Sequence, residues 1–275
     1  MSAPARGPVA IDAALARARD EGRVALIAYL TAGYPDPATS RACLEAAVAG
    51  GADVIEVGLP FSDPIMDGPT IQAANQVVLD AGLRLDEQLA IARDALAGAD
   101  VPAVAMTYTT VADTRGWERF AADCAAAGLD GAILPDLPVP EAGPWRAAAA
   151  ARDLATVFLA ASVSTDARLD EIAEASIGWV YAVGLLGVTG VDGVDDAATR
   201  RLVERVRART STPVAVGIGV RDAADAARVA AYADGVIVGS ALLRAAGDGD
   251  PAGAPGRVER LVAELRRGSD AVGRR

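Results

Sequence analysis

The sequence predicts a (β/α)8 barrel, the TIM-barrel fold, in which eight parallel strands form a closed ring covered by helices. Eight short runs rich in Val, Ile and Leu recur along the 275 residues, and Ala-rich, charge-bearing segments of helical character separate them. Nearly continuous apolar runs are typical of parallel strands that helices cover. No boundary divides the chain, so we expect one domain over residues 1–275, with flexible tails at residues 1–9 and 268–275.

The expected strands and helices alternate in chain order. The strand runs are VALIAYLT from Val24, DVIEVGLP from Asp53, VPAVAMTY from Val101, GAILPD from Gly131, ATVFLAA from Ala155, GWVYAVG from Gly178, PVAVGIG from Pro213 and DGVIVGS from Asp234. Helices are expected at residues 37–49, 69–80, 86–97, 117–127, 141–151, 197–209, 222–232 and 257–267, with a loop at 245–256. An extra N-terminal helix at residues 11–21 would close the end of the barrel where the strands begin.

An open doubly wound sheet is the alternative fold, because it also alternates strands and helices. Its dinucleotide signature would be a Gly-rich turn in the first strand–helix unit. The lone GIG at residues 217–219 lacks the third glycine and follows a late strand. The barrel accounts for all eight runs and is the preferred prediction.

Composition excludes several partners and chemistries. The formal net charge is −11, from 37 acidic and 26 basic residues, so the molecule's field repels nucleic acid and anionic membrane surfaces. An anionic substrate can still bind where backbone N–H groups converge, because helix termini act locally. The chain has no His, and every basic residue is Arg, which excludes a lysine Schiff base and the commonest metal ligand. We therefore expect no metal and no other cofactor, with proton transfer by carboxylates or Tyr.

Cysteine usage and the chain's apolar segments predict the compartment. Cys43 and Cys124 lie far apart in Ala-rich segments, without the spacing of zinc or redox sites, so we expect both in the core. The opening MSAPARGPVA lacks the apolar run of a signal peptide, and no stretch approaches the roughly 20 apolar residues of a membrane span. We expect a soluble, cytoplasmic protein.

A barrel places catalytic side chains at the carboxyl ends of its strands and in the loops that follow them. Two carboxylates lie in such a region, in and after the second strand run. Glu56 lies between Ile55 and Val57, so partial desolvation should raise its pKa and suit it to proton transfer; the alternative is a structural ion pair with Arg. Asp67 follows in the loop before a helix that Pro69 would start, so helix capping is its alternative role.

Several stretches closely resemble the tryptophan synthase alpha-subunit family, in the family's order and over nearly the whole chain. They are LIAYLTAGYPDP, IEVGLPFSDPIMDGPTIQ, GLDGAILPDLP, GVTG and PVAVGIG followed by ADGVIVGSAL. PFSDPxxDGPTIQ is the most specific, whereas GVTG and GSAL alone are weak. The resemblance implies a lyase that splits indole-3-glycerol phosphate into indole and glyceraldehyde 3-phosphate, a retro-aldol cleavage that needs neither lysine nor metal.

The resemblance also implies catalytic roles. Glu56 would deliver a proton to the indole ring carbon that bears the side chain and would deprotonate the glycerol hydroxyl. Asp67 would accept a hydrogen bond from the indole N–H and stabilise the positive charge that develops on the ring. Tyr181 would orient Glu56, and Tyr29 and Tyr108 would line the indole pocket. Ordinary core packing explains these tyrosines about as well.

The substrate phosphate would bind, by the same resemblance, at Gly190, Gly219, Gly239 and Ser240. These residues lie in the loops after the last three strands, where barrels commonly bind phosphate through backbone N–H groups. Each glycine taken alone is more typical of a turn. Their joint placement favours a phosphate site.

The match to the family is weaker in three loops. MTYTTVADTRG stands where the family has a stretch like M-T-Y-Y-N-P, so residues 109–113 are an atypical version of a loop that helps to contact the beta subunit. Gly184 and Leu185 stand where a Ser-Arg-like pair is common, and SVS at residues 162–164 replaces a Pro-Thr-containing loop. We still expect a beta-subunit partner, in an alpha2beta2 complex.

Three other functions stay open. A stand-alone indole-3-glycerol phosphate lyase of specialised metabolism would release free indole. A non-catalytic homologue would bind the ligand or activate a beta subunit without turnover, although the retention of Glu56 and Asp67 argues against it. A phosphate-binding isomerase or decarboxylase on the same barrel is disfavoured by the PFSDPIMDGPTIQ stretch.

Overall fold

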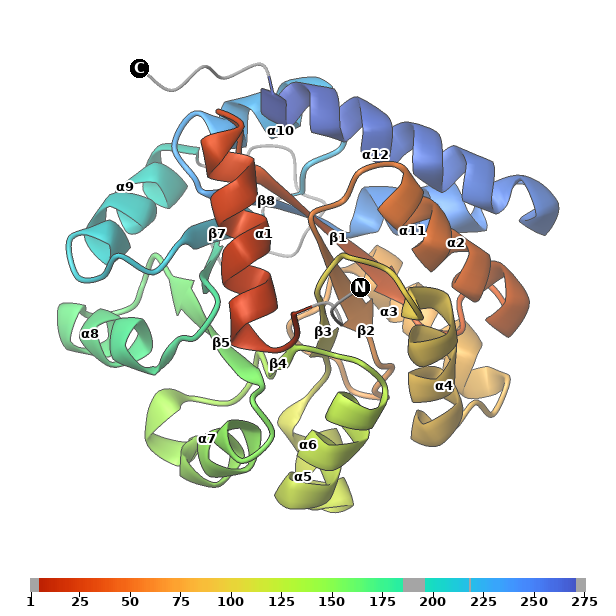
Figure 1. The fold of residues 1–275 in the computed structure, drawn as a ribbon, viewed down its shortest axis with the longest axis horizontal. Helices are drawn as coiled ribbons and strands as arrows, with labels where there is room; N and C mark the ends of the chain where they lie inside the picture. Colours follow the sequence, from red (N-terminus) through yellow and green to blue (C-terminus); the bar gives the residue numbers. More distant parts are fainter. Residues whose placement is uncertain (1–4, 185–195, 218, 271–275) are drawn as a thin grey trace.

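Eight parallel strands close into a barrel in chain order, with β8 paired to β1 (Figure 1). The computed structural model describes residues 5–184, 196–217 and 219–270. The strands are β1 (Ala25–Thr31), β2 (Val54–Gly58), β3 (Ala103–Met106), β4 (Gly131–Ile133), β5 (Ala155–Ala161), β6 (Val180–Val183), β7 (Val214–Gly217) and β8 (Gly235–Val238). Each strand lies within one of the eight apolar runs, which confirms the predicted barrel.

Helices cover the outside of the strands (Figure 1). They are α1 (Pro8–Asp20), α2 (Pro37–Ala49), α3 (Pro69–Asp80), α4 (Leu85–Leu96), α5 (Thr109–Arg115), α6 (Trp117–Ala126), α7 (Gly143–Ala150), α8 (Asp166–Ala175), α9 (Asp196–Arg207), α10 (Ala223–Ala230), α11 (Ser240–Gly247) and α12 (Ala254–Asp270), with the 3-10 helices η1 (Val139–Glu141) and η2 (Pro251–Gly253). Helices α2 and α3 have the predicted bounds. None of the helices in the described ranges is long and apolar enough to cross a membrane.

Helices α5, α8 and α11 have no counterpart among the expected ones. Helix α8 follows Thr165, whose hydroxyl accepts the N–H of Arg168, a capping signal that the sequence contains. Helix α5 occupies the stretch expected as a loop, because the carboxylate of Asp136 accepts both the N–H and the hydroxyl of Thr109 at 2.8 Å. The loop expected at residues 245–256 is shorter, since α11 and α12 extend into it.

Helices also include part of both expected tails. Helix α1 begins at Pro8, and the N–H of Gly7 donates to Asp130 Oδ1 at 2.7 Å. Helix α12 continues to Asp270, and an added Cβ at the buried Gly268 would collide with the backbone of Ala223. Residues 8, 9 and 268–270 of the expected tails thus belong to α1 and α12, and the flexibility of residues 1–9 and 268–275 stays a prediction.

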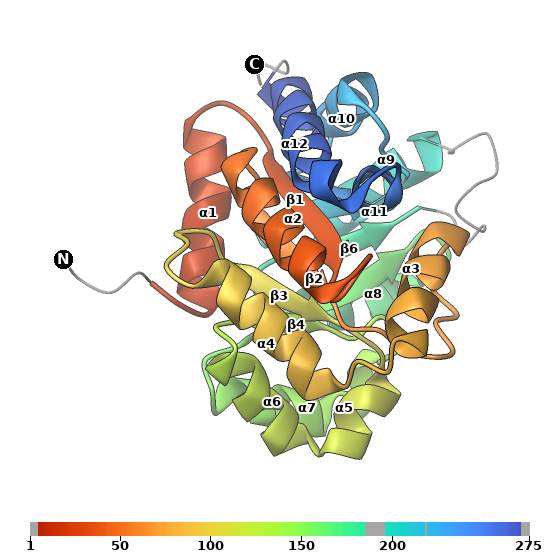
Figure 2. The same cartoon turned by 90° about the vertical axis from the view of Figure 1, so that its right-hand side faces the viewer.

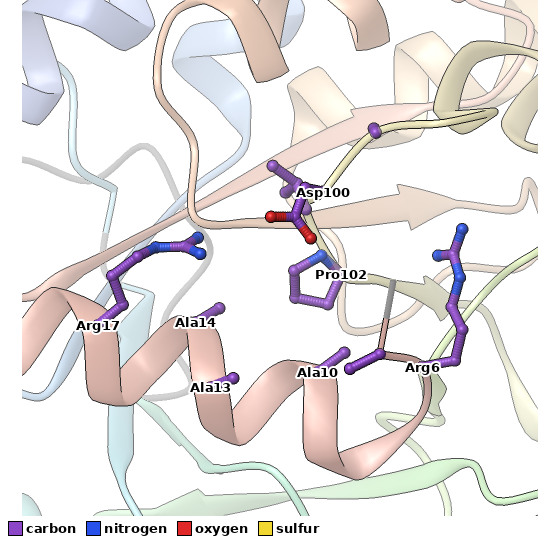
Figure 3. Close-up of a pocket in the computed structure, with 10 residues that line it drawn as sticks. Arg6, Ala10, Ala13, Ala14, Arg17, Asp100 and Pro102 are labelled. Atoms are coloured by element: carbon purple, nitrogen blue, oxygen red, sulfur yellow. The ribbon is translucent and has the colours of Figure 1, made fainter. Parts of the chain in front are cut away.

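Helix α1 closes the end of the barrel at which the strands begin (Figures 1 and 2). Its buried residues Ile11, Ala14, Leu15 and Ala18 join the inward apolar side chains of the strands in one cluster. A small cavity of about 50 Å³ lies between α1 and residues 99–102 (Figure 3), with Arg6, Arg17 and Asp100 in its lining. Because apolar side chains fill this end, the polar site lies toward the carboxyl ends of the strands.

Three aspartates precede even-numbered strands and bind backbone N–H groups of the neighbouring strands. The pairs are Asp53 with Leu26 (2.9 Å), Asp130 with Ala103 (2.9 Å) and Asp234 with Val214 (3.0 Å). The buried Arg23 also forms hydrogen bonds of 2.7 and 2.9 Å to Asp53. The Asp53 contacts support the register in which Tyr29 of β1 lies beside Glu56 of β2.

Candidate active site

Glu56 lies in the middle of β2, on the face that points into the barrel. Its neighbours Ile55 and Val57 belong to the apolar layer between strands and helices. The side chain is 1% exposed, and Oε1 has no hydrogen-bond partner among the residues that the structure describes. Burial raises the pKa of Glu56 to about 8. Glu56 therefore holds its proton through most of the neutral range, and no arginine in the described ranges forms the alternative ion pair with it.

Two tyrosines share the interior with Glu56. Tyr29 pairs with Glu56 in the β1–β2 register, and Tyr181 reaches the interior from β6. Burial, and then the negative charges of Glu56 and Asp67, raise the pKa of Tyr181 well above its usual value. The same groups raise the pKa of Tyr29, again with burial as the first cause. Both hydroxyls therefore stay protonated, and both lie within electrostatic reach of the two carboxyl groups.

Glycines on adjacent strands make room for these rings. An added Cβ at Gly217 of β7 would lie 2.6 Å from the hydroxyl of Tyr181, and one at Gly58 of β2 would overlap the hydroxyl of Tyr29. Gly239 lies against the other side of Tyr29, where an added Cβ would be 3.2 Å from the ring. Glycine at these positions is therefore needed for close approach, which keeps the tyrosines near Glu56.

Asp67 lies in the loop between β2 and α3 and does not cap the helix. Gly68 is the N-cap residue of α3, and no side chain forms a cap hydrogen bond there. The carboxylate instead accepts a hydrogen bond from Asn75 Nδ2 at 3.4 Å and one from the hydroxyl of Tyr108. Burial raises the pKa of Asp67 to about 6, although both hydrogen bonds lower it. Asp67 is therefore mostly ionised at pH 7, whereas Glu56 is mostly protonated.

Tyr108 connects the Asp67 loop to the start of α5. Its ring is 4% exposed and stacks on Phe61 with ring centroids 5.2 Å apart, and its hydroxyl accepts the N–H of Met66 at 3.0 Å. Burial and the charge of Asp67 raise the pKa of Tyr108. The same hydroxyl thus binds the loop backbone and the Asp67 carboxylate.

The residues expected to bind phosphate are only partly described. Gly190 lies outside the described residues. Gly219 follows β7 with φ of 62°, a conformation that favours glycine. Gly239 is the N-cap residue of α11 and Ser240 its first residue, and no side chain forms a cap hydrogen bond at this helix start. Contact with Tyr29 places Gly239 next to the carboxylate pair.

Asn75 and Thr31 are polar residues at this site that the sequence did not single out. Asn75 is 4% exposed on α3 and Thr31 is 1% exposed at the end of β1. Thr31 Oγ1 donates to Asn75 Oδ1 at 3.5 Å and lies 3.3 Å from the hydroxyl of Tyr29. The only signal in the sequence is an Asn on the same side of α3 as the apolar Ala74 and Val78.

A groove of about 430 Å³ lies beside Phe61. It is lined by Phe61, Arg84, Leu85, Asp86, Thr110, Val111, Thr114 and Arg115. No three His, Cys, Asp or Glu side chains within the described ranges form a group that could hold a metal ion. The structure thus brings Glu56, Asp67, Tyr29, Tyr108 and Tyr181 together, and Phe61, which stacks on Tyr108, also lines this groove.

Comparison with known proteins gives the same family throughout. The family model for the tryptophan synthase alpha chain matches residues 15–269. The tryptophan synthase alpha chain of Streptomyces coelicolor is 50% identical over 256 residues, which cover 92% of this chain and 94% of the relative. That of Thermobifida fusca is 47% identical over 264 residues, covering 94% and 97%.

Solved structures show the same similarity. A chain in a structure of Mycobacterium tuberculosis tryptophan synthase is 44% identical, with a TM-score of 0.89 and coverage of 95% of this chain and 98% of that one. Tryptophan synthase subunit alpha from Legionella pneumophila is 29% identical, with a TM-score of 0.86 and coverage of 96% and 99%. The match spans all eight strands, including β2 with Glu56, and the loop that holds Asp67, and the chain therefore belongs to the tryptophan synthase alpha chain family.

Proposed function

We propose that Glu56 and Asp67 carry out the chemistry of an indole-3-glycerol phosphate lyase, which cleaves its substrate into indole and glyceraldehyde 3-phosphate. The observation that carries this proposal is the pair of carboxyl groups with separated pKa values, about 8 for Glu56 and about 6 for Asp67. At neutral pH one group holds a proton and the other is an anion. A retro-aldol cleavage of this substrate uses both states.

Glu56 transfers the protons. Its carboxylic acid delivers a proton to the indole ring carbon that bears the glycerol chain. The resulting carboxylate then removes the proton from the hydroxyl on the adjacent carbon. The carbon–carbon bond breaks, its electron pair returns to the ring, and the hydroxyl carbon becomes the aldehyde. One proton leaves Glu56 and one returns, so the group ends each turnover in its starting state.

Asp67 stabilises the intermediate between these transfers. Protonation of the ring carbon places positive charge on the indole nitrogen, and a carboxylate that accepts the N–H hydrogen bond stabilises that charge most when it is greatest. Tyr108 and Asn75 hold the carboxylate from the protein side. Tyr29 and Tyr181 complete the walls around the ring, with Tyr181 as the orienting neighbour of Glu56.

The substrate phosphate binds at the start of α11. Gly239 and Ser240 present the first-turn N–H groups, and Gly219 lies in the loop after β7. Gly190, outside the described residues, stays a contact predicted from the sequence. The local dipole of the helix attracts the phosphate despite the net charge of −11. Because Gly239 contacts Tyr29, a substrate anchored there places its ring toward the carboxylate pair.

The partner is a tryptophan synthase beta subunit, in an alpha2beta2 complex. The groove beside Phe61 and Val111 supports this, because it lies on the loops that hold Asp67 and Tyr108 and a bound partner there would fix both. The atypical stretch at residues 109–113 forms the first part of α5 in this groove. A cytoplasmic location and a single domain stay predictions from the sequence.

The test compares Glu56→Gln and Asp67→Asn with the unmodified protein, with and without a beta subunit. We expect Glu56→Gln to abolish indole release while substrate binding persists, and Asp67→Asn to lower kcat by about 100-fold or more. Full activity of Glu56→Gln would refute the mechanism. High turnover of the unmodified chain alone would favour the stand-alone lyase, and binding without turnover under all conditions would favour the non-catalytic homologue.

A further inference from the structure

A chain of buried polar groups runs from β1 to Asp67. The hydroxyl of Tyr29 lies 3.3 Å from Thr31 Oγ1, which donates to Asn75 Oδ1 at 3.5 Å, and Asn75 Nδ2 donates to Asp67 Oδ2 at 3.4 Å. Thr31 and Asn75 are 1% and 4% exposed. Buried polar groups need partners, so each member of the chain constrains the next.

The direction of every hydrogen bond in this chain follows from its last member. An ionised Asp67 only accepts, so Asn75 must present its amide nitrogen there and its oxygen to Thr31. Thr31 has one hydroxyl hydrogen and gives it to Asn75, so the hydroxyl of Tyr29 must donate to Thr31. The hydroxyl hydrogen of Tyr29 is therefore committed to Thr31 and not available to Glu56.

Asn75 is one of two side chains in the described ranges that bind the Asp67 carboxylate. The other, Tyr108, belongs to the start of α5 and also binds the loop backbone at Met66. Asn75 is held differently, because it lies on α3 with its neighbours Ala74 and Val78 buried. The titratable groups that face Asp67 are Tyr29, Tyr108 and Tyr181, and Glu56 acts on Tyr29 and Tyr181 as well.

We propose that Asn75 is a positioning residue for the lyase reaction: its amide orients the Asp67 carboxylate toward the indole N–H, and Thr31 and Tyr29 hold that amide in one orientation. The inference rests on the proposed role of Asp67. Asn75 does not touch the reacting atoms. It acts through Asp67, by keeping the carboxylate ionised and turned toward the ring.

The test is the pH profile of indole formation by Asn75→Asp, which keeps the size of the side chain but replaces the amide donor with a second carboxyl group. We expect the acidic limb of kcat to move to higher pH by about one unit, so that kcat falls about tenfold at pH 5 and about twofold at pH 7, and we expect KM to change less than about threefold. Gln76→Ala is the matched control, because Gln76 is the next residue of α3, is exposed and donates its amide to Asp80 on the surface of the same helix. Its profile should match that of the unmodified protein.

Thr31→Val provides a second variant if Asn75→Asp does not fold. It is isosteric and removes the donor that fixes the Asn75 amide, and we expect a smaller shift in the same direction, with about a threefold loss of kcat at pH 5. Unchanged pH profiles in the variants that fold, or equal losses at every pH, would overturn the positioning role. Asp67→Asn separates the two proposals: if it is fully active, the proposed function fails; if it is inactive while Asn75→Asp has an unchanged profile, only the positioning role of Asn75 fails.

Discussion

Glu56→Gln should stabilise the fold at neutral and alkaline pH, because burial makes ionisation of Glu56 costly. The pKa of this group rises from 4.5 to about 8 on folding, so the folded state binds the proton more tightly than the unfolded state does. The free energy of unfolding therefore falls as pH rises from the unfolded to the folded pKa. At about 1.4 kcal/mol per pH unit, the cost is about 1 kcal/mol at pH 5 and about 4 kcal/mol at pH 8.

The assay is urea unfolding of both proteins at pH 5, 6, 7 and 8. Glutamine has nearly the shape of glutamate but does not ionise, so any constant effect of the amide cancels when differences between pH values are compared. We expect the stability of Glu56→Gln relative to the unmodified protein to grow by about 3 kcal/mol between pH 5 and pH 8. The control is Asp20→Asn, because the side chain of Asp20 is 76% exposed. If the stability curves of the unmodified protein and of Glu56→Gln ran parallel across this range, the burial argument for the proton donor would be refuted.

Three other outcomes test the site. The pH dependence of kcat/KM should be bell-shaped, with apparent pKa values near 6 from Asp67 and near 8 from Glu56. We expect a maximum near pH 7 and a loss of roughly tenfold at pH 5 and pH 9. A flat profile in steady-state kinetics would contradict both assignments. Gly217→Ala should displace the Tyr181 ring, because the new Cβ would lie 2.6 Å from the hydroxyl of Tyr181. We expect kcat to fall about tenfold, and thermal unfolding would check that the barrel persists. Ser240→Glu should raise KM by about tenfold or more with little change in kcat, because a carboxylate at the start of α11 would repel the phosphate; an unchanged KM would move the phosphate site elsewhere.

The barrel could be predicted from sequence because its signal is local and repeated. Each apolar run contains one strand, and Glu56 stood out as a charge inside such a run. Helix α8 went unpredicted although Thr165 caps it, because its acidic residues obscure the apolar spacing of its buried residues. Helix α5 could not be found locally, since the group at its start is Asp136, which follows a different strand.

The part of the site that escaped prediction depends on contacts between distant segments. Asp67 could equally have been a helix cap, and only the position of Gly68 at the helix start excludes that role. Asn75 looks like any polar residue of an exposed helix until α3 is packed on β1 beside Thr31. The sequence thus predicted the two carboxylates that we propose to react, whereas the side chains that hold Asp67 could be identified only from the fold.

The aspartates at the strand starts also divide the barrel into units. Asp53, Asp130 and Asp234 join β1 to β2, β3 to β4 and β7 to β8, whereas β6 follows the carboxylate-free stretch Ser-Ile-Gly-Trp. Three strand pairs thus carry a carboxylate link at their base, whereas β5 is joined to the segment before β6 by the hydroxyl of Thr156, which donates to the carbonyl of Ala175 at 3.0 Å. A cut between β4 and β5 would divide the barrel into two four-stranded halves and leave each of these three links within one half, so the links would support both pieces during reassembly.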